Sequence, residues 1–161
     1  MTATVQLHEY TATDTGVDKT SDTIRFKSAD ETTVDTTNRL TIPGSGSDFS
    51  YTKQCRLYAT VAAGTSLENV AAYSDGASGY GTGIDVFYDT SAEWVTQTDA
   101  DISGTDFFTK TSGATIDLGG SDITATTGYF GDVLRLQMHV DDTASPGALT
   151  PEALTMSYEE T

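Results

Sequence analysis

The sequence predicts an all-β fold, a single-domain antiparallel β-sandwich over residues 1–161 with about eight or more short strands. Residues 133–140 alternate apolar and polar side chains, which is typical of a strand with one face in a core. Threonine, whose branched Cβ favours strands, is abundant. Short apolar stretches alternate with Gly-, Asp- and Ser-rich turns, and none of them has convincing helical periodicity.

In the first half, apolar alternation predicts strands over residues 4–11, 23–27, 39–42, 51–61 and 67–74. Polar loops at 11–22 and 28–38 separate the first three, and Pro43 ends the third. Lys53 interrupts the inward face of the longest strand, so we expect that end of the strand to lie at the rim of the fold. Cys55, the only cysteine, falls on the same face and is expected to be a small buried side chain without a disulfide.

In the second half, the same pattern predicts strands over residues 84–88, 115–118, 123–128, 133–140 and 154–159. Residues 89–115 scatter aromatic side chains among Asp, Ser and Thr, which predicts one or two short strands within a long excursion. The last two strands are joined by a Pro- and Gly-containing loop, and we expect them to be antiparallel neighbours. The strand order stays open, so jelly-roll and immunoglobulin-like sandwiches are both compatible with the pattern.

The charge balance excludes some classes of partner. With 24 acidic against 8 basic residues and a formal net charge of −16, the chain is not expected to bind nucleic acid or an anionic membrane surface. Solubility accounts for the charge, with a high-salt source, a basic partner or cation binding as alternatives. Residues 1–10 lack a secretory signal and no apolar stretch approaches about 18 residues, so no membrane span is predicted.

No catalytic or cofactor-binding residues are predicted. His8 and His139 are the only histidines, and we expect both to be exposed on strands, too few for a zinc site. A Cys–His pair would require the buried Cys55, and no Gly-x-Ser-x-Gly elbow is present. The many paired carboxylates leave a glycosidase-like enzyme as an alternative, although chance pairs are expected in so acidic a chain.

Two acidic loops are candidate calcium sites. Asp75 and Asp85 bracket a glycine-rich loop, and Asp99 and Asp101 lie in another. Calcium takes carboxylate and carbonyl oxygens, so a structural calcium ion is conceivable here, although neither loop matches an EF-hand. The alternative is that Gly and Asp are simply the residues that turns require.

Several stretches resemble one family of proteins. They are Val-Gln-Leu-His-Glu-Tyr-Thr-Ala-Thr-Asp-Thr-Gly at 5–16, Ile-Arg-Phe-Lys-Ser-Ala-Asp at 24–30, Tyr-Thr-Lys-Gln-Cys-Arg-Leu-Tyr at 51–58, Phe-Gly-Asp-Val-Leu-Arg-Leu-Gln at 130–137, Thr-Ala-Ser-Pro-Gly at 143–147 and Leu-Thr-Met-Ser-Tyr-Glu-Glu at 154–160. Together they resemble small β-rich virion structural proteins of tailed bacteriophages.

The resemblance implies a non-enzymatic component of the virion, made in the host cytoplasm. The favoured role is a capsid decoration (cement) protein that binds the outer surface of the major capsid protein shell as a homo-oligomer, with a trimer possible. A neck, tail or fibre-associated virion protein is an alternative. A different class, a carbohydrate- or calcium-dependent adhesive module, is favoured by the acidic glycine loop and the available Tyr and Trp residues.

The partner interface is expected in the excursion at residues 89–108. Trp94, Phe107 and Phe108 are aromatic side chains in polar surroundings, and such residues suit the centre of a protein–protein interface. The alternative for all three is ordinary core packing.

Overall fold

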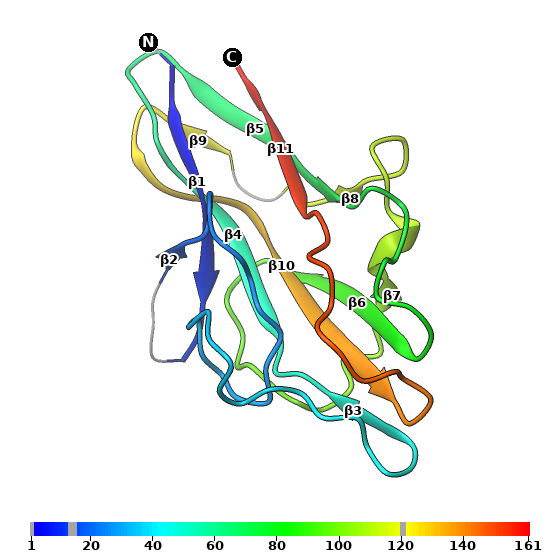
Figure 1. The fold of residues 1–161 in the computed structure, drawn as a ribbon. Coiled ribbons are helices and arrows are strands. Elements are labelled where there is room, and N and C mark those ends of the chain that lie inside the picture. The colour runs from blue at the N-terminus through cyan, green and yellow to red at the C-terminus, as the bar shows by residue number, and fades with distance from the viewer. Residues whose placement is uncertain (1, 13–15, 120–121) are drawn as a thin grey trace.

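The computed structural model describes residues 2–12, 16–119 and 122–161, and it consists of two antiparallel sheets packed as a β-sandwich (Figure 1). The all-β prediction is therefore confirmed.

The larger sheet has the order β2-β1-β4-β10-β6-β7, with β3 also paired to β10, and its strands are β1 (Thr4–Tyr10), β2 (Val17–Asp18), β3 (Ser47–Phe49), β4 (Lys53–Thr60), β6 (Ile84–Ser91), β7 (Thr105–Asp106) and β10 (Thr127–Asp141). The smaller sheet has the order β11-β5-β8, with β9 also paired to β5, and its strands are β5 (Ser66–Tyr73), β8 (Ile116–Asp117), β9 (Ile123–Thr124) and β11 (Thr155–Glu160). Among the described residues, the one helical element is the 3-10 turn η1 (Phe107–Thr109).

Strand β10 is the centre of the fold. It pairs with β4 on one side and β6 on the other, and its far end also pairs with β3. Its register against β4 shifts between Phe130 and Leu134, where Gly131 has a φ of +70°. A Cβ at this position would lie 2.8 Å from the Val70 side chain and 2.9 Å from the Leu118 carbonyl oxygen. The bulge therefore needs glycine, both for its backbone angle and for the close approach of β10 to the smaller sheet.

The core lies between the inner faces of the two sheets. The predicted inward residues of β10 are buried, namely Leu134, Leu136, Met138 and Val140. They pack with Cys55 and Leu57 of β4 and with Leu67 and Val70 of β5. Cys55 is fully buried, as the sequence predicted.

The outer face of β10 is not uniformly open to solvent, although its polar residues had suggested so. Gln137 is fully buried, because residues 95–104 cross this face of the sheet. Its side-chain amide donates to the carbonyl oxygens of Ser50, at 2.9 Å, and of Ala100, at 3.0 Å. The long excursion predicted after β6 is thus confirmed, and part of it covers the larger sheet.

Two strand predictions in the first half are wrong. Residues 23–27 and 39–42 belong to a long irregular segment between β2 and β3. Ile24 and Phe26 do pack against the core, as their alternation suggested. However, neither stretch is a strand: the Lys27 carbonyl oxygen accepts the Tyr51 N–H, and the next residue, Ser28, bonds to Asn38 of the same segment. Residues 13–15 of the loop predicted before this segment lie outside the described residues.

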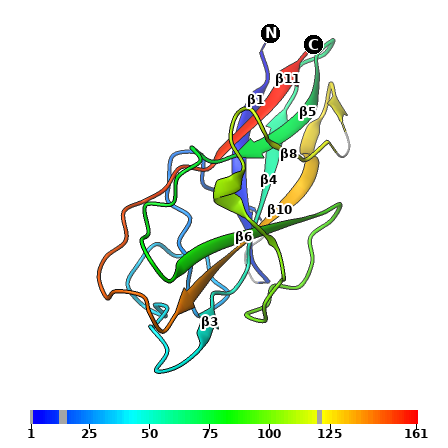
Figure 2. The ribbon, with the colours of Figure 1, turned by 90° about the vertical axis from the view of Figure 1, so that its right-hand side faces the viewer.

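The prediction that the last two strands are neighbours is also wrong. Both edges of β10 are already occupied by β4 and β6, so no edge is left for β11. Residues 142–154 instead cross to the smaller sheet, where β11 pairs with β5 (Figure 1). The two termini lie at the same end of the molecule (Figure 2), where the Ala3 backbone N–H donates to Glu160 Oε1 at 3.1 Å. No helix within the described ranges is long and apolar enough to cross a membrane.

Candidate functional site

A cluster of aromatic rings lies on the outer face of the larger sheet, and we call it the aromatic patch. Side chains alternate along a strand, so with Leu7 facing the core the neighbouring positions of β1 face outward. The pairing of β4 with β10 places Tyr58 opposite Tyr129, and both rings lie beside the outward side chains of β1. The loop after β6 adds Trp94. The members of the patch are His8, Tyr10, Tyr58, Trp94 and Tyr129.

The rings of the patch pack against one another in defined geometry. His8 stacks on Tyr58 with a centroid separation of 4.7 Å, and Tyr10 stacks on Trp94 at 4.6 Å. Tyr129 stands edge-on to Tyr58 at 5.0 Å and to Trp94 at 5.4 Å, so it joins the two stacks. Four of the five rings are half-buried, namely those of Tyr10, Tyr58, Trp94 and Tyr129. The patch is therefore a rigid surface that still presents aromatic area to a partner.

The histidine of the patch is buried, which corrects the prediction that it is exposed. His8 is 8% exposed, and its Nδ1 lies 3.1 Å from Tyr129 Oη. Burial lowers the pKa of His8, so the ring is neutral at pH 7. Gly16 makes this arrangement possible, because a Cβ at that position would lie 2.0 Å from Tyr129 Oη.

The other histidine lies elsewhere on the same sheet. His139 is half-buried between the rings of Phe49, 5.1 Å away, and Phe87, 6.0 Å away. Its Nδ1 is 3.7 Å from Asp85 Oδ2. Strand β4 separates the strands that carry the two histidines, so they do not form a joint site.

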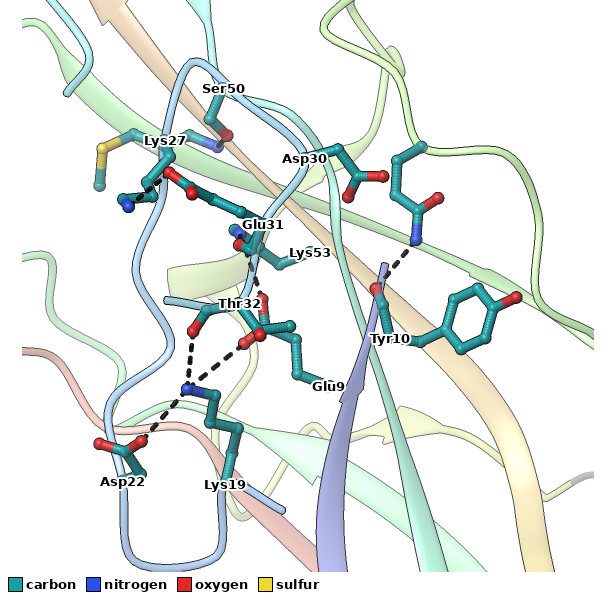
Figure 3. Close-up of polar contacts among 12 residues, drawn as sticks. Glu9, Tyr10, Lys19, Asp22, Lys27, Asp30, Glu31, Thr32, Ser50 and Lys53 are labelled. Atoms are coloured by element: carbon teal, nitrogen blue, oxygen red, sulfur yellow. Dashed lines mark hydrogen bonds and ion pairs between the residues drawn. The ribbon is translucent and has the colours of Figure 1, made fainter. Parts of the chain in front are cut away.

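A second polar feature is a group of three buried lysines, of which Lys19 and Lys27 belong to the irregular segment after β2 and Lys53 belongs to β4 (Figure 3). Lys53, which the sequence placed at the rim, has a side chain that is only 1% exposed. Its Nζ lies 3.1 Å from Oε1 of the equally buried Glu9, and Lys19 Nζ lies 3.9 Å from the other oxygen of that carboxylate. Burial raises the pKa of Glu9, while the two ammonium groups oppose that rise.

These lysines hold the irregular segment in place. Lys19 Nζ donates to the Thr32 carbonyl oxygen at 2.9 Å, and Lys53 Nζ donates to that of Glu31. Lys27 Nζ contacts the carboxylates of Glu31 and Asp35, and its hydrogen bond to Asp35 lowers the pKa of that acid to about 2. The Lys53 contact therefore fastens the segment to β4, whereas the Lys19 and Lys27 contacts join residues within the segment and hold its turns together.

The lysine group also shapes the outer surface. Lys19, Lys27 and Lys53 are three of the four lysines in the chain, and all three are buried. Arg56 is 7% exposed, with its Nε donating to the Gly131 carbonyl oxygen at 2.6 Å. Since four of the eight basic side chains are buried and Glu9 is the buried acid among the described residues, the outer surface is more acidic than the net charge of −16 suggests.

The structure separates the three residues predicted for a partner interface. Trp94 belongs to the half-exposed aromatic patch. Phe107 and Phe108 are 4% and 8% exposed and pack in the core, because η1 directs both rings toward the inner face of the sandwich. Core packing, the alternative for all three, therefore holds for the two phenylalanines, and they do not contribute to an exposed interface.

Of the calcium candidates, Asp75, Asp99 and Asp101 lie in loops, whereas Asp85 lies in strand β6. Asp75 Oδ1 accepts the Ala77 N–H at 3.1 Å, and Asp101 Oδ1 accepts the Ser103 N–H at 2.7 Å. Asp85 faces His139, while Asp99 is exposed in the segment that crosses the larger sheet. Across residues 2–12, 16–119 and 122–161, no three His, Cys, Asp or Glu side chains come together as a metal site would require. These contacts favour the turn interpretation of the loops.

Comparison of the chain with protein-family models, with curated proteins and with solved structures finds no significant match. The fold and the surface therefore carry the functional argument. Alternation on β1 and β4 could have indicated that the outer face is aromatic, since Tyr10 and Tyr58 occupy outward positions. Their meeting with Tyr129 and Trp94 depends on strand order, which alternation does not specify.

Proposed function

We propose that this chain is a non-enzymatic virion structural protein of a tailed bacteriophage. Its favoured role is a capsid decoration protein that stabilises the shell by binding the outer surface of the major capsid protein. The observation that carries the proposal is the half-exposed aromatic patch on the larger sheet. The whole-chain resemblance to small virion proteins supports the class of protein, and the patch supplies a surface through which it would bind.

The patch has the composition of an interface centre. Tyrosine and tryptophan dominate binding energy in protein complexes, because their large rings lose little conformational entropy on contact. Here the rings already hold one another in place, so binding would order few further side chains. Glu93, which is 80% exposed, and its ion-pair partner Arg56 give the patch a polar border.

The rest of the surface suits a densely covered particle. A strongly acidic exterior keeps neighbouring copies soluble and suppresses unspecific contacts. Association of several copies into a homo-oligomer, a trimer among the possibilities, is part of the proposal, since most soluble oligomers are closed, symmetric assemblies of one chain. The proposal places the protein on the virion, after synthesis in the host cytoplasm.

Cryo-electron microscopy of native particles tests the proposed location. Regular density for this chain at capsomer centres or at local three-fold positions is the expected result. Density confined to the neck, tail or fibres would retain a virion role and overturn the decoration role. Absence of the chain from purified particles would overturn both.

A binding assay tests the proposed surface. Undecorated shells are titrated with the wild-type chain, with Trp94→Ala and with Tyr158→Ala. Loss of a central aromatic anchor weakens binding by about 2 kcal/mol or more, so Trp94→Ala should bind shells at least roughly thirtyfold more weakly. Tyr158, 38% exposed on β11 of the smaller sheet, is the matched control and should have no effect. An equal loss of affinity for shells in both variants would show that the aromatic patch is not the binding surface.

The same patch supports a second candidate, an adhesive module that binds carbohydrate. Aromatic faces are platforms on which sugar rings stack, and Tyr58, Trp94 and Tyr129 all retain exposed area. A glycan array probed with the wild-type chain and with Trp94→Ala distinguishes the two candidates. Binding to a defined glycan that depends on Trp94 would favour the adhesive module over decoration.

A further inference from the structure

A cavity of about 380 Å³ opens between the inner face of the larger sheet and the loops that cover its lower half. It lies on the opposite side of that sheet from the aromatic patch. The smaller sheet does not reach this region, so residues 19–26 and 151–154 form much of the wall together with η1. Figure 1 shows the second of these segments on its way from β10 to β11. The volume is that of a site for a small organic molecule.

The floor of the cavity is apolar. It is built by inward side chains of the larger sheet and by the aromatic rings of η1 and the covering loops, namely Leu7, Phe26, Val86, Phe107, Phe108 and Leu136. Tyr80 stands at the side with its ring edge-on to Phe108, 5.9 Å away. Burial raises the pKa of Tyr80 to about 12, so its hydroxyl is neutral. A ligand that fills this floor must carry an apolar chain or ring.

The mouth of the cavity is polar, with Asp22 and Glu152 as its carboxylates and Lys19 as its basic side chain. The Lys19 ammonium already contacts Glu9, Asp22 and the Thr32 carbonyl oxygen. Asp22 is exposed over 55% of its side chain, but its two oxygens already accept from Lys19 Nζ, at 3.2 Å, and from the Thr23 N–H, at 2.8 Å. Glu152 accepts the Gly79 N–H through Oε1 at 2.8 Å, which leaves its second oxygen for another donor. The mouth therefore offers the second Glu152 oxygen rather than an unpaired cation.

The position of Glu152 depends on a glycine. A Cβ on Gly79 would lie 2.1 Å from Glu152 Oε1, so the Glu152 carboxylate fits against this loop only because residue 79 has no side chain. This contact brings residues 75–83 and the segment before β11 together at the cavity mouth. The acceptor is thus held in place by the fold rather than extending freely into solvent.

We propose that this cavity is a binding site for a small amphipathic amine, a molecule with an apolar chain or ring and a primary ammonium head. The apolar part lies on the floor formed by Val86, Leu136 and Phe108, and the head donates to the second oxygen of Glu152. A neutral head would leave this carboxylate without a charged partner, and an anionic head would be repelled by it. The site is independent of the proposed virion role.

Three probes of matched size test this preference. 2-Phenylethylamine, 2-phenylethanol and 3-phenylpropionate share a ring and a two-carbon chain and differ in the charge of the head. Each is titrated into the isotopically labelled full chain at fixed pH and ionic strength, and chemical shifts of backbone amides and methyl groups are followed. The expected result is tightest binding of the amine, about threefold or more above the alcohol, with shifts at Val86, Leu136 and Leu154.

Variants separate the site from general attraction of a cation to an acidic protein. Glu152→Gln should bind the amine at least about threefold more weakly and no better than the alcohol. Asp85→Asn changes the net charge by the same amount at an exposed position outside the cavity wall and should bind the amine as wild type does. Gly79→Ala, which displaces Glu152 without a charge change, should reproduce part of the loss.

Several results would overturn the proposal. They are the absence of binding by the amine, equal affinity for all three probes, shifts located at the aromatic patch, and an equal loss in the control variant. The heteronuclear spectrum of each variant reports whether it is folded, so a loss of binding is assigned only to folded proteins.

Discussion

Replacing Lys53 with Met tests whether the buried lysine group stabilises the fold. The substitution keeps an unbranched apolar side chain of similar length and removes the ammonium group that lies 3.1 Å from Glu9 Oε1. The Glu9 carboxylate then remains in the interior with Lys19, 3.9 Å away, as its remaining ion-pair partner. The Glu31 carbonyl oxygen also loses the Lys53 donor.

The magnitude follows from the burial of both groups. Removing one partner of a buried ion pair costs about 3–5 kcal/mol, because the other charge is left uncompensated. Both side chains are 1% exposed, which places the pair in this class. Lys19 retains part of the compensation, so we expect the lower end, a loss of about 3 kcal/mol for Lys53→Met. For a chain of this size such a loss lowers Tm by roughly 6–12 °C.

The assay is urea unfolding of a double-mutant cycle with Glu9→Gln, Lys53→Met and the combined variant. Because the two residues interact directly, the loss of unfolding free energy in the combined variant should be smaller than the sum of the two single losses, by about 1.5 kcal/mol or more. Glu93→Gln is the control, since it removes the 80% exposed partner of an ion pair and should cost less than about 1 kcal/mol. A loss below about 1 kcal/mol in Lys53→Met, or strict additivity in the cycle, would refute the reasoning.

Three further predictions concern other parts of the fold. The pKa of Asp35 is about 2 in the folded protein, below its ordinary 3.8, so its contribution to stability is present above pH 3.8 and is lost as the pH falls toward 2; Asp35→Asn should flatten the acid limb of a Tm-against-pH profile, and an unchanged limb would contradict this. Cys55 is fully buried and burial raises its thiol pKa, so Ellman's reagent should leave the native chain unlabelled and label one thiol per chain in denaturant; rapid native labelling would show that the core opens there. Gly131→Ala should lower the free energy of unfolding by about 2 kcal/mol or more, because its φ of +70° and the Cβ contacts at 2.8–2.9 Å both oppose a side chain; Gly46→Ala, with a φ of +70° in open space, is its control, and equal losses in the two would assign the effect to the backbone angle alone.

The amino-acid sequence by itself determined the fold class and the positions of the main strands. Alternation along residues 51–61, 67–74 and 133–140 was sufficient, because the side-chain period of a strand is a local property. The burial of Cys55 followed from the same alternation. Alternation also showed that Ile24 and Phe26 share an apolar face, although it could not show whether a neighbouring strand would pair with that segment.

Tertiary structure decided the features that depend on which strands are neighbours. β11 joins the smaller sheet because β4 and β6 occupy both edges of β10, and no local pattern near β11 carries that information. Lys53 is buried because the register of β1 against β4 brings Glu9 beside it, so an apparent break in the inward face becomes an internal ion pair. The aromatic patch arises in the same way, since Tyr58 meets Tyr129 only through the pairing of strands distant in the sequence. Local side-chain chemistry specifies which face a residue prefers, whereas strand order and register determine what it finds there.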